Sequence, residues 1–198
     1  MVTRPRTAAL RDQMSRIVVA YPRIAAADFE WIQEYRRRND PRYFQLIDPH
    51  FTLVFPVADV SADDFCREVR TQASDVDFIN FEIKIATINR DLTGSYYHEF
   101  LVPDAGYAAL VKLHDRLYSG ILASHLRLDI DFIPHIGIGN TDDPLVAKRN
   151  VDALNARGVQ IAGTIEALDI LEYDDGRVRP LDRVDLRPAR VARHCRNV

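Results

Sequence analysis

The spacing of apolar residues along the chain predicts a mixture of strands and helices. Residues 16–22 form a β-branched apolar run that ends at proline, which is typical of a buried strand. Residues 25–38 repeat their apolar positions at helical spacing, whereas residues 78–88 alternate apolar and polar, as a half-buried strand does. The same reasoning predicts further helices over about 61–73, 107–122 and 141–158, and further strands over about 51–57, 96–102, 132–139, 160–173 and 177–186.

The order of these predicted elements repeats. Each half of the chain reads strand, helix, strand, helix, strand, and the second half adds one more strand. The middle strand of each half carries a histidine that follows a proline, and the two histidines, His50 and His135, are 85 residues apart (135 − 50). We therefore expect a single domain over 1–198, made of two lobe repeats over about 16–91 and 96–186, with a basic tail over 187–198.

Composition limits the classes of protein that the chain can belong to. With 198 residues, 47% hydrophobic and 28% charged, it is suited to one globular domain with its own core. A net charge of −3 argues against coating long nucleic acid, but leaves room for a cleft that takes one phosphate or a short RNA end. Cys66 and Cys195 form no disulfide framework, no apolar run is long enough for a membrane span, and Met1 to Arg6 start no signal peptide, so we expect a cytoplasmic protein.

The two histidine stretches can supply acid and base chemistry. Residues i and i+2 share one face of a strand, so His50 should lie beside Thr52, and His135 beside Gly137. Imidazole, with an unperturbed pKa of about 6.5, can take a proton from an attacking oxygen or give one to a leaving oxygen near neutral pH. A hydroxyl and backbone amides can hold the remaining oxygens of a phosphate, and this chemistry requires no metal.

These stretches resemble the paired motif of the 2H phosphoesterase superfamily, which contains the 2′-5′ RNA ligase-like proteins and the RNA 2′,3′-cyclic phosphodiesterases. The family motif is histidine, any residue, threonine or serine, apolar residue, and it occurs twice. The residues 50–53 match it fully, and the residues 135–138 match except that Gly137 stands where the hydroxyl residue is expected. The resemblance covers roughly 16–186 and implies an α+β, duplicated, two-lobed (LigT-like) fold, with two antiparallel-rich sheets flanking a central cleft and helices outside.

The resemblance also implies an activity and its residues. It implies a metal-independent hydrolase that opens a 2′,3′-cyclic phosphate of RNA or a nucleotide, or ligates 2′-5′ in reverse, without a cofactor. His50 would be the acid toward the leaving oxygen, His135 the base toward water, and Thr52 a phosphate contact. The amide of Gly137, or the neighbouring Asn140 and Thr141, would replace the missing hydroxyl, and Tyr97 is a further candidate for substrate binding. The expected partner is an RNA end or a small cyclic-phosphate nucleotide, with no membrane and no partner protein, and we expect a monomer.

Other interpretations stay open. Gly137 could mark a member that lost catalysis and only binds a nucleotide or RNA end, or the substrate could be another ester, such as a cyclic ADP-ribose phosphate or another small metabolite. Asp129 and Asp131 near His135 suggest a metal site, which we do not expect. Two further groups could contact RNA, although strand packing and a charged helix end are the commoner explanations; they are Tyr21, Tyr96, Tyr97 and Tyr173, and Arg36, Arg37, Arg38 and Arg42.

Overall fold

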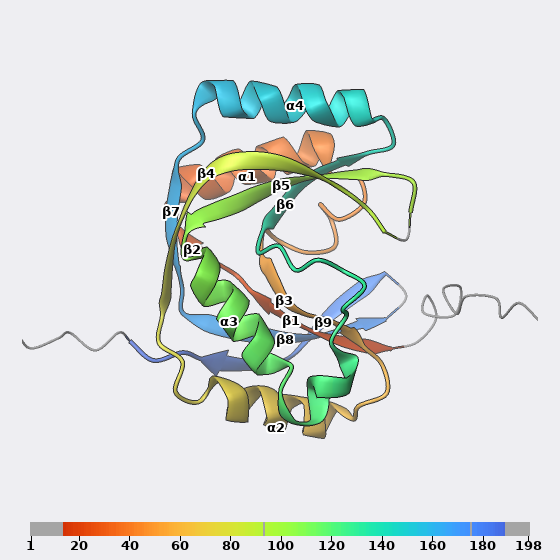
Figure 1. Ribbon diagram of the computed structural model, residues 1–198, viewed down its shortest axis with the longest axis vertical. Helices are drawn as coiled ribbons and strands as arrows, with labels where there is room; N and C mark the ends of the chain where they lie inside the picture. The colour runs from red at the N-terminus through yellow and green to blue at the C-terminus, as the bar shows by residue number, and fades with distance from the viewer. Residues whose placement is uncertain (1–13, 93, 175, 189–198) are drawn as a thin grey trace, which may run out of the picture.

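The computed structural model describes residues 14–92, 94–174 and 176–188 and shows two antiparallel sheets with helices packed around them (Figure 1). The first sheet has the order β3-β1-β8-β9, and the second has the order β2-β7-β4-β5-β6. All neighbouring strands in these sheets are antiparallel. This arrangement confirms the predicted α+β class with two antiparallel-rich sheets. In chain order the elements are β1 (Ser15–Ala20), β2 (Arg23–Ile24), α1 (Ala26–Asn39), β3 (Phe51–Val57), α2 (Ala62–Ala73), β4 (Ile79–Arg90), β5 (Tyr97–Ala105), α3 (Tyr107–Leu117), η1 (Gly120–His125), β6 (Ile136–Thr141), α4 (Pro144–Arg157), β7 (Ile161–Ile165), β8 (Ala167–Asp174) and β9 (Arg177–Asp185).

The two halves of the chain exchange strands between the sheets. In the first sheet, β3 and β1 come from the first half, and β1 pairs with β8 of the second half. In the second sheet, β6 and β5 come from the second half, and β5 pairs with β4 of the first half. The repeated element order is therefore present, but each sheet contains strands of both 16–91 and 96–186.

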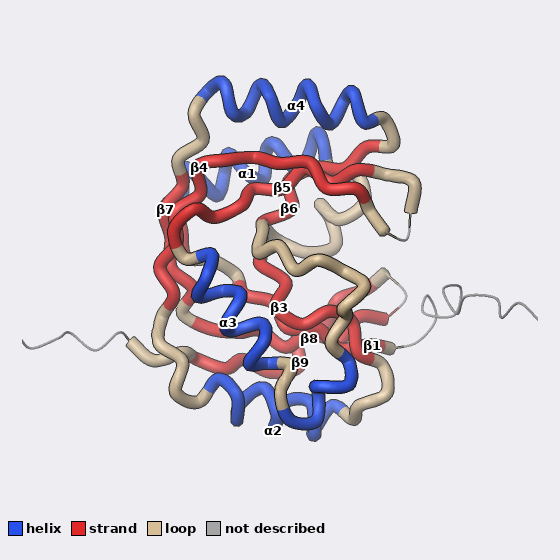
Figure 2. Tube along the Cα trace, viewed as in Figure 1, coloured by secondary structure: helices blue, strands red, loops and turns tan. Residues whose placement is uncertain are grey.

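The helices follow the same exchange. Helix α1 leads from β2 to β3 in the chain but packs against β6, and α3 lies between β5 and β6 in the chain but packs against β3. Helices α1 and α4 lie together at one end of the molecule over the second sheet, and α2 lies at the opposite end (Figure 2). Because the halves interlock in this way, the two histidine strands, β3 and β6, are edge strands of different sheets.

Three predicted boundaries differ from the structure. The strand predicted over 160–173 breaks at Glu166 into β7 and β8, which belong to different sheets. Strand β5 continues past Pro103 to Ala105, and the helix predicted to reach 122 ends at Leu117, before the 3₁₀ turn η1. Gly120, at the start of that turn, has φ of +60°, a conformation that favours glycine and that an α-helix cannot include.

One hydrophobic core joins the two sheets. Phe51 of β3 is fully buried, and its ring lies 5.1 Å from that of Phe81 of β4, edge to face. Ser61 caps α2, since its hydroxyl accepts a hydrogen bond from the amide of Asp64. Cys66 is a free, buried thiol, while Met1 to Arg6, Cys195 and all of the predicted basic tail after 188 lie outside the described residues. Within the described part of the chain, no helix combines the length and apolarity needed to cross a bilayer.

Candidate active site

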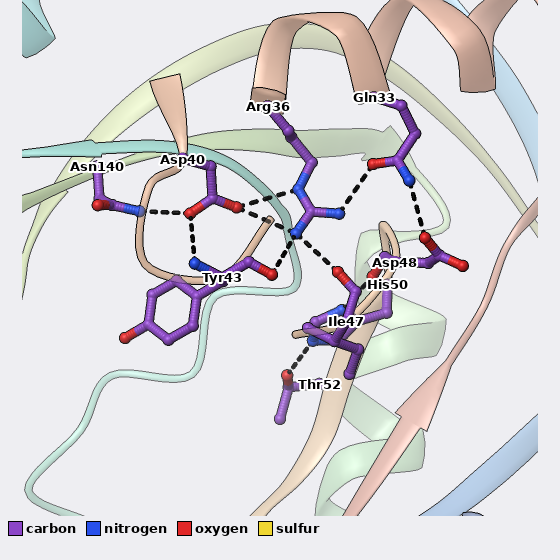
Figure 3. Close-up of polar contacts among 9 residues, drawn as sticks. All are labelled: Gln33, Arg36, Asp40, Tyr43, Ile47, Asp48, His50, Thr52 and Asn140. Carbon is purple, nitrogen blue, oxygen red and sulfur yellow. Dashed lines mark hydrogen bonds and ion pairs between the residues drawn. The ribbon is translucent and has the colours of Figure 1, made fainter. Parts of the chain in front are cut away.

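His50 lies one residue before β3, in a geometry fixed by its own backbone. Its Nδ1 is 2.7 Å from the carbonyl oxygen of Asp48, and its Nε2 is 3.2 Å from the hydroxyl oxygen of Thr52 (Figure 3). A carbonyl only accepts, so Nδ1 carries the proton and Nε2 is left with its lone pair when the ring is neutral. The predicted neighbourhood of His50 and Thr52 is therefore present.

His135 has the same local arrangement at the start of β6. Its Nδ1 is 2.6 Å from the carbonyl oxygen of Ile133, again two residues earlier. Both histidines thus precede their strands by one residue. For His50 this agrees with the strand predicted over 51–57, whereas the strand predicted over 132–139 included His135. Pro134 explains the difference, because proline has no amide to donate to a strand ladder and pairing starts after it. The duplicated sequence therefore gives two histidines with the same backbone-defined tautomer.

A row of stacked rings covers one side of His135. Phe100 of β5 lies parallel to the imidazole, with ring centroids 3.5 Å apart and planes at 19°. His98 stacks on the other side of Phe100 at 5.2 Å, and Tyr43 and Tyr96 contact His98 at 6.3 and 4.9 Å. Since Phe100 pairs with Gly137 across the β5 and β6 ladder, this row of rings runs along the strand that flanks the second motif.

Burial lowers the pKa of both candidate catalytic histidines. The pKa of His50 falls from 6.5 to about 4, mainly because the ring is desolvated, with the positive charge of Arg36 as a further cause. The pKa of His135 also falls to about 4 by desolvation, and the charges of His50 and His98 lower it further. Because one imidazole affects the proton affinity of the other, the two motifs occupy one electrostatic environment. Both rings are neutral at pH 7 in the free protein, and a bound anionic phosphate would raise both pKa values again.

Of the remaining predicted site residues, Gly137 leaves open space near His135, whereas Asn140 and Thr141 bond elsewhere and Tyr97 faces away. Gly137 lies two residues after His135, and a Cβ atom built on it would meet no heavy atom of the described residues within 4 Å, apart from Gly137 itself and its two chain neighbours. Asn140 is buried, and its amide nitrogen donates to Asp40. Thr141 uses its hydroxyl to accept from the amide of Asp143, before α4, and Tyr97 pairs with it across the ladder. Tyr97 is three positions from Phe100 and so faces the opposite side of β5 from His135.

The arginines and acids that could have formed other sites are engaged within the protein. Arg37 and Arg38 pair with Glu34, and Arg42 lies over the ring of Tyr96 and pairs with Asp142. Asp129 pairs with Arg127. Arg36, in contrast, points into the interior. The four arginines therefore do not gather at one surface for RNA phosphates, and Arg37 and Arg38 agree with the commoner interpretation of a charged helix end.

The sequence did not identify Phe100 or His98 as neighbours of His135. Both lie two positions apart in a predicted strand, so the sequence indicates that they share a face. It does not indicate which strand lies beside them, because that depends on the pairing of β5 with β6. The ring of Tyr21, named among the aromatic candidates, lies 6.2 Å from that of His50.

Two sheets related by strand exchange, each presenting a histidine fixed through Nδ1, define the class of two-histidine phosphoesterases. The sequence matches the 2′-5′ RNA ligase superfamily over residues 22–177, and the chain belongs to this family. A protein of Geobacillus sp. (strain WCH70), whose name assigns it provisionally to the phosphoesterases, is 32% identical over 125 residues, covering 62% of this chain and 66% of that protein. A similarly named protein of Bacillus licheniformis is 27% identical over 151 residues, covering 72% and 82%.

Solved structures show the same fold. Apo LigT of Escherichia coli superposes with a TM-score of 0.55 at 19% identity, covering 89% of this chain and 99% of LigT. A crystal structure described only as a phosphoesterase gives a TM-score of 0.54 at 18% identity, with the same coverage. These findings confirm the predicted 2H phosphoesterase resemblance and its LigT-like fold, and family membership is consistent with phosphodiester chemistry.

Proposed function

We propose that the protein is a metal-independent phosphodiesterase that opens the 2′,3′-cyclic phosphate of an RNA end or a nucleotide. The observation that carries this proposal is the repeated histidine geometry, in which Nδ1 of each ring donates to the carbonyl two residues earlier. Each Nε2 is thereby available to exchange a proton with an oxygen on phosphorus. One histidine can act as base and the other, once protonated, as acid.

In the proposed reaction His135 accepts a proton from water as the water oxygen forms a bond to phosphorus. The bond from phosphorus to the ribose 3′ oxygen breaks, and protonated His50 gives its proton to that oxygen, which leaves a 2′-phosphate. The hydroxyl of Thr52 holds a non-bridging oxygen, where negative charge increases in the transition state. With the 5′-hydroxyl of a second RNA end in place of water, the same steps would form a 2′-5′ phosphodiester bond. The assignment of His50 as acid and His135 as base follows the family resemblance.

The ring-lined side of the site supports a nucleotide-sized substrate. Tyr43, at 37% exposure, is accessible at the end of the row of rings that runs to His135, and aromatic faces bind unstacked bases. The nearby arginines already pair with acids or lie in the interior, which favours one or two nucleotides over a long RNA tract. The distant structural neighbour LigT was crystallised with 3′-AMP.

Gly137 favours a second candidate, a nucleotide-binding module without turnover. It leaves open space where the family motif places a hydroxyl, so one expected contact to the phosphate is absent. A site that binds the phosphate but stabilises the transition state poorly would retain affinity and lose rate.

Incubation with each 2′,3′-cyclic mononucleotide in EDTA, followed by ³¹P NMR, tests the proposal. We expect conversion to the 2′-phosphate, and a loss of about 10²- to 10⁴-fold in rate for His50→Ala and for His135→Ala. His125→Ala is the matched control, because His125 pairs with Asp59 and should leave the rate unchanged. Activity that EDTA abolishes, or that survives in both active-site variants, would refute the proposal. Binding without conversion by the parent protein would establish the module instead.

A further inference from the structure

Arg36 is a buried cation whose three guanidinium nitrogens all bond groups inside the protein. It lies in the last turn of α1 with 1% exposure, while its neighbours Arg37 and Arg38 are exposed. Nε and Nη2 bond Asp40 at 3.1 and 3.0 Å, and Nη1 donates to Gln33 at 3.1 Å. Nη2 also donates to two backbone carbonyls of the segment before His50 (Figure 3).

Burial of this ion pair costs desolvation free energy, so a gain in stability does not explain why the pair is buried. The side chains of Arg36 and Asp40 are 2% and 4% exposed. Two buried charges lose their hydration, and well-packed apolar residues in such places are often equally or more stabilising. Buried ion pairs can instead fix one particular arrangement of the chain. The residues that this pair contacts indicate which arrangement is fixed.

On one side, the pair fixes the segment that leads to His50. Residues 41–50 contain turns but neither helix nor strand. Arg36 Nη2 donates to the carbonyls of Tyr43 and Ile47 at 3.2 and 2.8 Å. Gln33 receives a bond from Arg36 and donates through its amide to the carboxylate of Asp48 at 2.8 Å. The backbone carbonyl of the same Asp48 then accepts from His50 Nδ1.

On the other side, the pair reaches the strand of the second histidine. Asp40 Oδ1 accepts a hydrogen bond from the side chain of Asn140 in β6, which begins directly after His135 (Figure 3). The same oxygen accepts from the amide of Tyr43 at 3.2 Å. One buried ion pair therefore contacts both the segment that carries His50 and leads into β3 of the first sheet, and the strand β6 of the second sheet, which follows His135.

We propose that Arg36, together with Asp40 and Gln33, is a positioning unit that holds His50 in one tautomer and one place relative to the strand of His135. Arg36 touches neither imidazole in this arrangement, and it acts through Ile47 and Asp48. As a role in catalysis, this inference rests on the proposed phosphodiesterase function. As a statement about the His50 ring, it does not, and the two parts can be measured separately.

Two variants and one control test the unit. Gln33→Ala removes the link to Asp48 together with the hydrogen bond from Arg36 Nη1, and it keeps the pair of Arg36 and Asp40. Arg36→Met with Asp40→Asn removes both charges together, so that no unpaired carboxylate is left buried. Arg37→Met is the control, because it removes a neighbouring arginine of the same helix that pairs with Glu34 at the surface.

The first readout is ¹⁵N NMR of the His50 ring at pH 7, which distinguishes the Nδ1–H from the Nε2–H tautomer. We expect the parent protein and Arg37→Met to show the Nδ1–H form, and Gln33→Ala to show a mixture. The second readout is steady-state kinetics with a 2′,3′-cyclic nucleotide. We expect kcat of Gln33→Ala to fall by about 10- to 100-fold with KM nearly unchanged, because misplacement of a catalytic group costs rate more than binding.

The outcomes separate the two proposals. If the parent protein turns over no cyclic nucleotide, the proposed function fails, and the tautomer of His50 still decides whether the unit positions the ring. If the double variant does not fold, Gln33→Ala carries the test alone. A folded Gln33→Ala with the parental tautomer and parental kcat would overturn the positioning role, and leave the ion pair as a structural contact only.

Discussion

The two histidines should make the protein sensitive to mild acid. In the folded protein each imidazole has a pKa of about 4, whereas in the unfolded chain it has the ordinary value near 6.5. As the pH falls below 6.5, the two imidazoles bind protons in the unfolded chain but remain neutral in the folded protein. The stabilisation is therefore complete above about pH 6.5 and is lost progressively as the pH falls toward 4.

The size of the effect follows from the two pKa values. For one imidazole, the free energy of unfolding should fall by about 2 kcal/mol between pH 7 and pH 5, and by about 3 kcal/mol once the pH is below 4. Both rings remain partly exposed, so these values are upper limits. For the two rings together, we expect a loss of about 3 kcal/mol between pH 7 and pH 5, a large part of the stability of an ordinary domain.

Urea unfolding at pH 7, 6 and 5 would measure this loss, with the parent protein compared to the double variant His50→Gln, His135→Gln. Glutamine keeps a polar side chain of similar size but takes up no proton. His114 also has a pKa lowered by burial, but it titrates in both proteins and cancels in the comparison. If the free energies of unfolding of both proteins fall equally between pH 7 and pH 5, His50 and His135 do not have pKa values lowered by burial.

Three further changes have defined expected results. Gly137→Thr should raise the rate of cyclic phosphate hydrolysis about tenfold or more, because it places a hydroxyl in open space beside His135, whereas Gly137→Ala should not; equal rates would show that no hydroxyl is missing. Phe51→Ala should lower the free energy of unfolding in urea by about 3–5 kcal/mol, since the ring is fully buried against Phe81, and a loss below 1 kcal/mol would contradict the packing. Ser61→Ala should cost about 1 kcal/mol by removing the cap of α2, with a lower Tm as the measurement, while Ser74→Ala at the other end of the helix should cost less.

The sequence predicted most elements because their signals are local. Alternation in β4 and helical spacing in α1 depend only on neighbouring residues, and both elements occur within one or two residues of the expected bounds. The break of the strand predicted over 160–173 is different. Its two parts belong to different sheets, and only the packing of those sheets requires the chain to turn at Glu166.

The site was predicted in part for the same reason. His50 and Thr52 are neighbours in the chain, so a strand pattern was enough to place them together. Asn140 and Thr141 were expected near the phosphate because they follow the second motif. The structure instead engages Asn140 with Asp40, one hundred residues away, and Thr141 with the start of α4.

The burial of Arg36 could not be predicted from the charged end of its helix. Three consecutive arginines look equivalent in the sequence, yet one enters the interior and the other two pair with Glu34 at the surface. Which of the three enters is decided by the direction in which the last turn of α1 faces the segment 40–50. That contact cannot be predicted from the sequence alone.

The sequence by itself determined the two motifs, the repeated order of elements and the backbone setting of each histidine, since these depend on residues within a few positions of one another. The tertiary structure decided that the halves exchange strands, that Phe100 and His98 lie along His135, and that a buried arginine connects the segment before His50 to the strand after His135. These features depend on which strands pair and which helix packs against which sheet. The pairing of strands and the packing of helices depend on burial of apolar surface over the whole core, which no short stretch of the chain specifies.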